Sequence, residues 1–254
     1  GVGVMLSRSA VAAWRAAGAP VWRISPRVIG VRLLVRDPRR RKQQLGILFG
    51  SCYAPVSSAS AADWDAYYSD VEQLLSHRCA GDVVVLATDG NASIGCGALG
   101  GSSSDRTGAV GPYGFSHVNA SGRRLRTFLE TNELASLASF FRKRHYGTWM
   151  HPCSRLMHQL DHLLVSRADI FRFTDAGSVS GQLIHSDHRA LCGKLRIALA
   201  QHRRRQSDRS KLTRLDFSSL RGQQGGQARH AFARCVLQQL GLPAPPPLPP
   251  LPSL

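Results

Sequence analysis

Residues 83–95 read VVVLATDGNASIG, and this stretch decides how the rest of the chain can fold. Its first five residues are apolar, as in a strand that is buried on both faces. The run stops at Asp89, Gly90 and Asn91, a combination that favours a tight turn. A buried strand that ends in this way presents a carboxylate and a carboxamide at one edge of its sheet.

The segments on either side of this strand alternate between strand and helix patterns. Short runs rich in β-branched residues predict strands, and apolar residues at helical spacing predict helices. The expected strands are residues 1–7, 27–35, 45–53, 159–167 and 188–197, and the expected helices are residues 60–78 and a segment capped by Ser121. Strands that alternate with helices, with several close strand pairs, favour an α/β sandwich over a doubly wound sheet.

The chain changes character near residue 200. We expect a folded domain over residues 1–199, a basic linker with a short helix over 200–240, and a disordered tail over 241–254. The tail holds seven of the 13 prolines, so it is either a spacer or a ligand for an aromatic groove on a partner. Within the domain, residues 91–119 are rich in Gly and Ser and predict a long surface loop, which is commonly functional.

The charge of the chain is strongly positive, with 33 Lys and Arg against 16 Asp and Glu and a net charge of +17. This surplus favours a polyanionic partner, with nucleic acid (DNA) before an anionic membrane surface. A cluster at residues 36–42 predicts a solvated hairpin tip. No apolar run is long enough to span a bilayer, and the six cysteines lack the spacing of a zinc module or a disulfide framework. We therefore expect an intracellular protein, nuclear or cytoplasmic, whose oligomeric state the sequence leaves open.

Polar residues with catalytic chemistry stand at four of the expected strand ends. They are Tyr53 in SCYAP, Asp89 and Asn91 in TDGN, Asp161 and His162 in QLDH, and Asp187 and His188 in HSDH. Each has an ordinary interpretation as a turn, a core residue or a surface pair. Their joint occurrence in a basic protein favours one shared site, because rigid strand ends are where sandwich enzymes place such residues. His162 should point to the opposite face from Asp161 and be structural.

The order of these motifs resembles that of the endonuclease/exonuclease/phosphatase superfamily, the fold of pancreatic deoxyribonuclease. It is most similar to the endonuclease domains of LINE-type retrotransposons. The matching stretches are YAP at 53–55, TDGN at 88–91, residues 111–132, TW at 148–149, QLDHLL at 159–164 and SDH at 186–188. The resemblance implies a four-layer α/β/β/α sandwich of two mostly antiparallel sheets. It also implies an N-terminally incomplete domain without the strands that carry the family's first Asn and its metal-binding Glu.

The resemblance implies a catalytic role for five residues in phosphodiester hydrolysis. Asp89 would orient or deprotonate the attacking water, and Asn91 would hold the phosphate beside it. His188 would donate to the phosphate, with Asp161 bonded to it and fixing its tautomer. Tyr53 would donate a hydrogen bond to a phosphate oxygen.

The same resemblance implies a divalent cation, Mg²⁺ with Mn²⁺ as the alternative, held by Asp187, Asn91 and Asp89. Oxygen ligands suit Mg²⁺. A soft-metal pair of His185 and His188 is the weaker interpretation. Compared with the family pattern, Thr88 adds bulk and Gly90 should loosen the turn.

Three functions follow as alternatives. The first is a metal-dependent DNA endonuclease of retrotransposon origin, with weak or no activity if the first strands are missing. The second is a catalytically inactive remnant that binds nucleic acid through salt-dependent contacts. The third is a phosphatase or phosphodiesterase of the same fold that acts on another ester, such as a phosphoinositide, sphingomyelin or poly(A).

Overall fold

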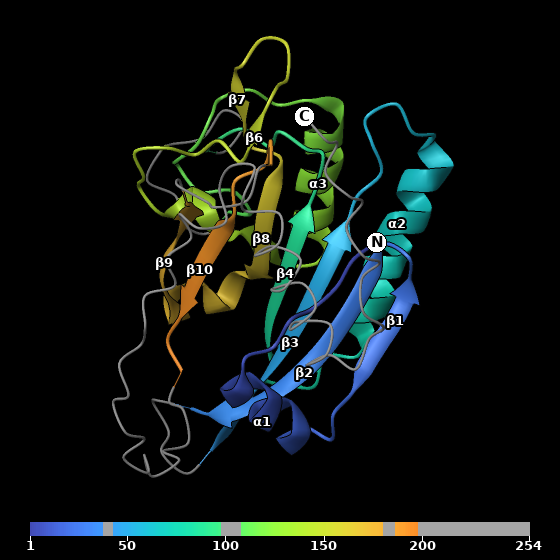
Figure 1. Ribbon diagram of the computed structural model, residues 1–254, viewed down its shortest axis with the longest axis vertical. Coiled ribbons are helices and arrows are strands. Elements are labelled where there is room, and N and C mark those ends of the chain that lie inside the picture. The colour runs from blue at the N-terminus through green and yellow to red at the C-terminus, as the bar shows by residue number, and fades with distance from the viewer. Residues whose placement is uncertain (38–42, 98–107, 180–185, 198–254) are drawn as a thin grey trace, which may run out of the picture. The chain divides into compact units, whose positions relative to one another are not determined.

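The structure is a computed structural model that describes residues 1–37, 43–97, 108–179 and 186–197 (Figure 1). Several predictions lie outside the described residues: the basic linker, the proline-rich tail, most of the hairpin tip, His185 and the middle of the long loop. None of the helices that the structure describes is both long and apolar enough to cross a membrane.

A six-stranded sheet with the order β1-β2-β3-β4-β8-β5 forms the centre of the domain. Strands β3 and β4 are parallel, and the other neighbours are antiparallel. The strands are β1 (Val21–Ser25), β2 (Val28–Arg36), β3 (Gln44–Tyr53), β4 (Val83–Asp89), β5 (Leu134–Ser136) and β8 (Asp161–Ser166). The predicted class, an α/β fold with a mostly antiparallel sheet, is therefore confirmed.

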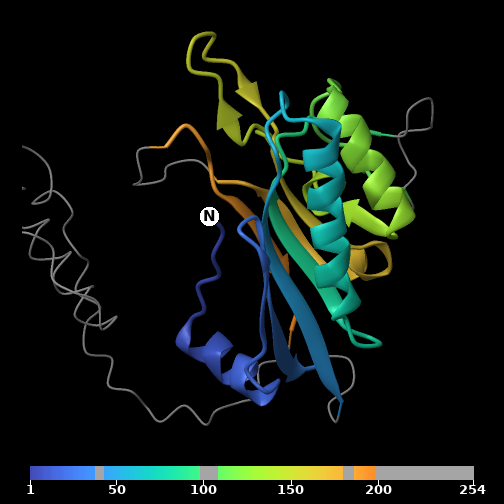
Figure 2. The same ribbon diagram turned by 90° about the vertical axis from the view of Figure 1, so that its right-hand side faces the viewer.

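Two helices, α2 (Ala61–Ser76) and α3 (Ala120–Thr131), cover one face of this sheet, as Figure 2 shows. Ser60 and Asp63 form a capping box that begins α2. Leu74 of α2 is fully buried against the sheet, and a Cβ on the underlying Gly30 would approach its Cδ1 to 2.2 Å. The absence of a side chain at Gly30 thus lets this helix lie close to the sheet.

The other face of the sheet is covered by a smaller antiparallel pair, β9 (Phe173–Ser178) and β10 (Leu191–Leu195). Two 3₁₀ helices, η1 (Leu137–Phe140) and η2 (Arg167–Arg172), and helix α1 (Arg8–Ala16) complete this side. The two faces have separate cores. The second core includes Val35, Ile47, Val85, Val165 and Phe173.

The predicted strand over residues 1–7 is wrong. These residues belong to no described ladder, and Ser7 caps α1 instead. Val2, Val4 and Leu6 are half-buried while their neighbours are exposed, so the alternating pattern marks an extended segment on the surface. The pattern specified the conformation of the segment but not a pairing partner.

Asn119, not the predicted Ser121, caps α3. Its Oδ1 accepts a hydrogen bond of 2.7 Å from the Gly122 N–H and one of 3.1 Å from the Ser93 N–H. Ser121 is buried inside the first turn. The other predicted elements are confirmed near their expected bounds, whereas β1, β9, α1 and the short strands β6 (Trp149–Met150) and β7 (Met157–His158) were missed.

Candidate functional site

Three neighbouring strands place polar side chains opposite one another at one edge of the sheet. Tyr53, the last residue of β3, pairs with Asp89 of β4, and Asp89 pairs with Asp161 of β8. Residues that pair directly across strands project to the same face. The sheet therefore delivers a phenol and two carboxylates, far apart in the chain, to a single row.

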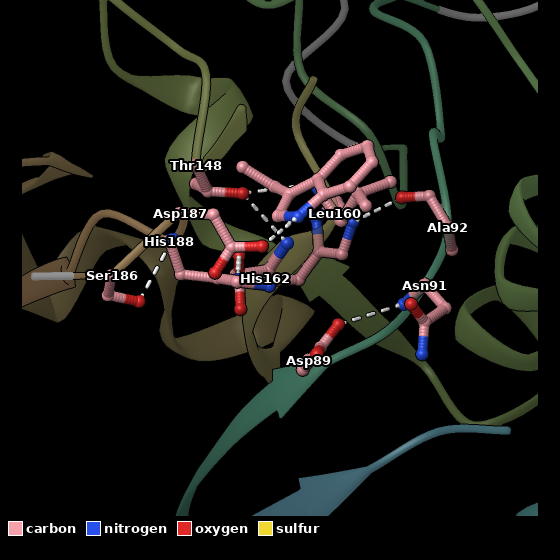
Figure 3. Close-up of polar contacts among 11 residues, drawn as sticks. Asp89, Asn91, Ala92, Thr148, Leu160, His162, Ser186, Asp187 and His188 are labelled. Atoms are coloured by element: carbon pink, nitrogen blue, oxygen red, sulfur yellow. Dashed lines mark hydrogen bonds and ion pairs between the residues drawn. The ribbon is translucent and has the colours of Figure 1, made fainter. Parts of the chain in front are cut away.

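His188 completes a compact polar group with the two carboxylates. Its Nδ1 lies 3.0 Å from Oδ2 of Asp161. Asp89, Asp161 and His188 each offer a ligand atom, and these three atoms lie within 4.8 Å of one another. All three residues are partly buried, so the group is shielded and still reachable from solvent. Figure 3 shows His188 beside Asp187, above the end of β4 that carries Asp89.

The pKa of Asp89 is raised above its ordinary value. The largest cause is burial, and the charge of Asp161 adds to it. The N–H of Asn91 and the charge of His188 oppose this shift without cancelling it. Asp89 therefore takes up a proton more readily than an ordinary exposed aspartate does.

Asn91 forms the turn after β4 with a positive φ of 45°, in the left-handed region that Asn tolerates better than most residues. Its N–H donates to Oδ1 of Asp89 at 3.2 Å, and its Nδ2 donates to the Ala54 carbonyl at 3.2 Å. Figure 3 shows Asn91 beside Asp89 at the end of the strand. The structure thus brings together Tyr53, Asp89, Asn91, Asp161 and His188, as the sequence predicted.

Asp187 is not one of the three residues whose ligand atoms lie within 4.8 Å of one another, although its charge contributes to the raised pKa of Asp89. Oδ2 of Asp187 accepts a hydrogen bond of 2.8 Å from Nε1 of Trp149, and this bond is the main reason that the pKa of Asp187 is lowered. The carboxylate is exposed to solvent. Three imidazoles surround the same indole, those of His151, His158 and His188, at centroid distances of 5.4, 5.7 and 6.5 Å.

Thr148 is a site residue that the sequence analysis missed. Its buried Oγ1 accepts hydrogen bonds of 3.0 Å from the N–H groups of both Leu160 and Asp161. Its carbonyl accepts one of 2.6 Å from Arg189, which follows His188. Thr148 therefore links the two segments that carry Asp161 and His188. The TW pair at residues 148–149 indicated a motif in the sequence, but it did not assign a role to the threonine.

His162 points away from Asp161, as expected, and is buried on the helix side of the sheet. Its Nε2 lies 2.8 Å from the Ala92 carbonyl oxygen, and its Nδ1 lies 3.2 Å from Oγ of Ser136. Burial lowers the pKa of this imidazole. Gly90 is closely packed beneath it, because a Cβ there would meet Cδ2 of His162 and the Leu160 oxygen at 3.2 Å each. The expectation that Gly90 loosens the turn is therefore not supported by the packing.

A depression of about 380 Å³ opens over the row of strand ends. Its lining includes Tyr53, Asp89 and Asp161, together with residues 1–3 and 189–191. A larger hollow of about 710 Å³, lined by Arg78, Glu133 and Arg167 among others, contains none of the predicted site residues.

No protein-family model matches the chain. Over 149 residues it is 29% identical to craniofacial development protein 2 of Bos taurus, which covers 58% of this chain and 24% of that protein. The corresponding protein of Tragulus javanicus is 28% identical, with 58% and 25% covered. The chain thus spans about a quarter of the length of the curated relatives it matches.

Three solved structures resemble the chain at low sequence identity. The endonuclease domain of TRAS1, a telomere-specific non-LTR retrotransposon, is 14% identical with a TM-score of 0.44, covering 67% of this chain and 62% of that one. The 3′ phosphatase NExo from Neisseria, bound to a product DNA hairpin, is 15% identical with a TM-score of 0.47, covering 68% and 66%. An endonuclease/exonuclease/phosphatase family protein from Leptotrichia buccalis is 11% identical with a TM-score of 0.41, covering 66% and 52%.

Proposed function

We propose that this chain is a phosphodiester hydrolase of the endonuclease/exonuclease/phosphatase type, and specifically a metal-dependent endonuclease that acts on DNA. One observation carries the proposal: three strand ends place Tyr53, Asp89 and Asp161 in one row, with His188 bonded to Asp161. The net charge of +17 favours a polyanionic substrate.

Asp89 is the residue suited to accept a proton from the attacking water. A general base works best when its pKa lies near the working pH, and the pKa of Asp89 is raised by burial and by Asp161. The hydrogen bond from the Asn91 N–H to Oδ1 of Asp89 orients the carboxylate. Asn91 would add its carboxamide to the binding of the phosphate.

Asp161 and His188 form the second half of the proposed machinery. Asp161 accepts the Nδ1–H of His188, which sets the tautomer and leaves Nε2 for a phosphate oxygen. Tyr53, which is 38% exposed at its strand end, can donate its hydroxyl proton in a hydrogen bond to the same phosphate. These contacts would stabilise negative charge as it develops on the phosphate oxygens.

The residues present fit a divalent cation. Two carboxylates and an imidazole offer atoms within 4.8 Å of one another, and an oxygen-rich set of this kind suits Mg²⁺ or Mn²⁺. Asp89 and Asn91 would hold the ion from the turn, and Asp187 would hold it from the opposite segment. A cation bound there would neutralise charge on the phosphate.

Plasmid nicking tests the proposal. The full chain should convert supercoiled DNA to open circles with Mg²⁺ or Mn²⁺, lose this activity with EDTA, and lose it in Asp89→Asn. An exposed substitution away from the site, Thr174→Val, is the matched control. Salt-dependent DNA binding without any turnover would identify the inactive remnant, and turnover of phosphoinositide, sphingomyelin or poly(A) in preference to DNA would identify the other esterase.

A further inference from the structure

We propose that buried His162 is a positioning residue that holds the turn from Asp89 to Ala92 in its working shape. This inference rests on the proposed function, because it concerns the same site. The imidazole is buried, and its hydrogen-bond partners are Ser136 and Ala92 and not Asp89 or Asn91. It acts through the backbone that lies between the site and the core.

The ring of His162 connects three elements. It belongs to β8, its Nδ1 lies 3.2 Å from Oγ of Ser136 on β5, and its Nε2 lies 2.8 Å from the carbonyl of Ala92 after β4. His162 is 1% exposed and Ser136 is fully buried, so water does not substitute for either contact. The turn is thereby tied to two strands of the sheet through one side chain.

The tautomer of the ring follows from its partners. A backbone carbonyl only accepts hydrogen bonds, so Nε2 carries the proton that it donates to Ala92. Nδ1 then accepts from the hydroxyl of Ser136, which can rotate to donate. The Ala92 carbonyl thus fixes the tautomer, and the Ser136 hydroxyl satisfies the remaining ring nitrogen. A phenylalanine would fill the same space without either bond.

The turn needs a contact of this kind because Asn91 adopts a left-handed conformation, which local preferences disfavour. Asn91 has a φ of 45°, and its N–H must reach Oδ1 of Asp89. Ala92 is the next residue, so fixing its carbonyl fixes the exit from the left-handed position. Gly90, which precedes Asn91, donates its N–H to the Leu160 carbonyl at 2.9 Å. This bond fixes the backbone just before the left-handed position.

The fit between Gly90 and His162 supports this role. Gly90 has an ordinary φ, so its conformation does not require glycine. A side chain there would meet Cδ2 of His162 at 3.2 Å, closer than most Cβ contacts. The close packing of the His162 ring therefore depends on the absence of a side chain at Gly90. The imidazole lies directly against the turn.

The test uses variants of His162 in the full chain, assayed by plasmid nicking with Mn²⁺. His162→Phe removes both hydrogen bonds, and we expect kcat to fall about tenfold or more while KM changes little, as misplaced catalytic groups do. His162→Gln keeps a donor near Nε2 and should restore most of kcat. Leu164→Val, on the same strand and the same buried face, is the matched control that should lose stability and keep kcat.

A second readout needs no activity. Hydrogen exchange followed by NMR should show the Asn91 N–H protected in the wild type and in Leu164→Val, and faster in His162→Phe. If His162→Phe does not fold, Ser136→Ala removes the hydrogen-bond partner of Nδ1 and should give a smaller change in the same direction.

The two proposals fail differently. A wild-type chain without turnover contradicts the proposed function, while faster exchange at Asn91 in His162→Phe would still support the positioning role. Unchanged kcat together with unchanged exchange at Asn91 would overturn that role. An equal loss of kcat in Leu164→Val, or no recovery in His162→Gln, would overturn it as well.

Discussion

The turn after β4 and the segment that carries His188 reach the same site by different means. The turn leaves a strand buried on both faces, and backbone hydrogen bonds tie it to β3 and β8, from Ala54 to Asp89 and from Gly90 to Leu160. The segment at residues 186–190 is largely exposed and depends on contacts with Thr148 and Trp149. One half of the site is therefore placed by the sheet, and the other by backbone contacts with residues 148–150 and by the indole of Trp149.

The two halves of the site are therefore positioned by different kinds of contact. The sheet sets the row of Tyr53, Asp89 and Asp161 through register alone. His188 reaches that row only because the Thr148 carbonyl accepts from Arg189 and a bridge joins Trp149 to His188. Variants of the second half should thus change the position of His188 with little effect on the sheet.

The largest expected effect tests whether both halves are needed. Asp89→Asn removes the proton acceptor of the turn, and His188→Gln removes the imidazole of the segment. Each should lower kcat for plasmid nicking by about 10²–10⁴-fold, the usual contribution of a positioned acid or base. Full activity in His188→Gln would break the comparison, because the exposed half would then be dispensable.

Thr148→Val should have the next largest effect. The valine keeps the shape of the side chain and leaves the N–H groups of Leu160 and Asp161 without their buried acceptor. Each unsatisfied group costs about 1–3 kcal/mol, so the free energy of unfolding measured in urea should fall by at least that amount. Thr174→Val, whose hydroxyl is exposed, should change it by less than about 0.5 kcal/mol. Equal effects would show that Thr148 is not a special link.

Trp149→Phe should have a smaller effect, confined to the exposed half. It removes the indole N–H that keeps the pKa of Asp187 low, so that pKa should rise toward its ordinary value in a carboxyl NMR titration. We expect kcat to fall by roughly threefold to tenfold, less than for a buried hydrogen bond to a charged group, because the carboxylate of Asp187 is exposed. Trp22→Phe, which alters an indole stacked on His77 elsewhere, should leave Asp187 unchanged.

The smallest expected effect is a gain in stability. Because the folded state raises the pKa of Asp89, its ionisation opposes folding once the pH exceeds the unfolded value. Without divalent ions, Asp89→Asn should therefore have a slightly higher Tm than the wild type at pH 7. The difference should shrink as the pH falls through the raised pKa and vanish below the ordinary Asp value. A lower Tm at pH 7 would mean that the carboxylate stabilises the metal-free turn.

The sequence predicted the sheet-built half of the site better than the hairpin-built half. The run from Val83 to Asp89 identified a buried strand and its polar end, because burial on both faces leaves a continuous apolar pattern. Thr148 escaped notice because a buried hydroxyl that satisfies two distant N–H groups leaves no local pattern. The same limit explains the error at residues 1–7, where alternation was real but a pairing partner is a tertiary property.

Helix ends show a related limit. Ser121 and Asn119 are both good N-cap residues, and only the hydrogen bonds from Gly122 and Ser93 to Asn119 decide between them. The hydrogen bond that Asp187 accepts is another feature that the sequence could not predict. The role of Asp187 as a metal ligand stays a prediction, and its bond to Trp149 depends on a two-residue strand that periodicity cannot detect.

The pairing of Tyr53, Asp89 and Asp161 has a consequence for how the protein tolerates mutation. Side chains on a strand alternate between its faces, so deleting one residue within β4 would turn Asp89 toward the helices and bring Gly90 into its place. Exchanges of one aliphatic residue for another should be absorbed along these strands, while single-codon losses should abolish the site at any position between Val83 and Thr88. A deletion scan and a substitution scan of these strands would test this consequence. Single deletions should abolish activity, while aliphatic substitutions at the same positions should be tolerated.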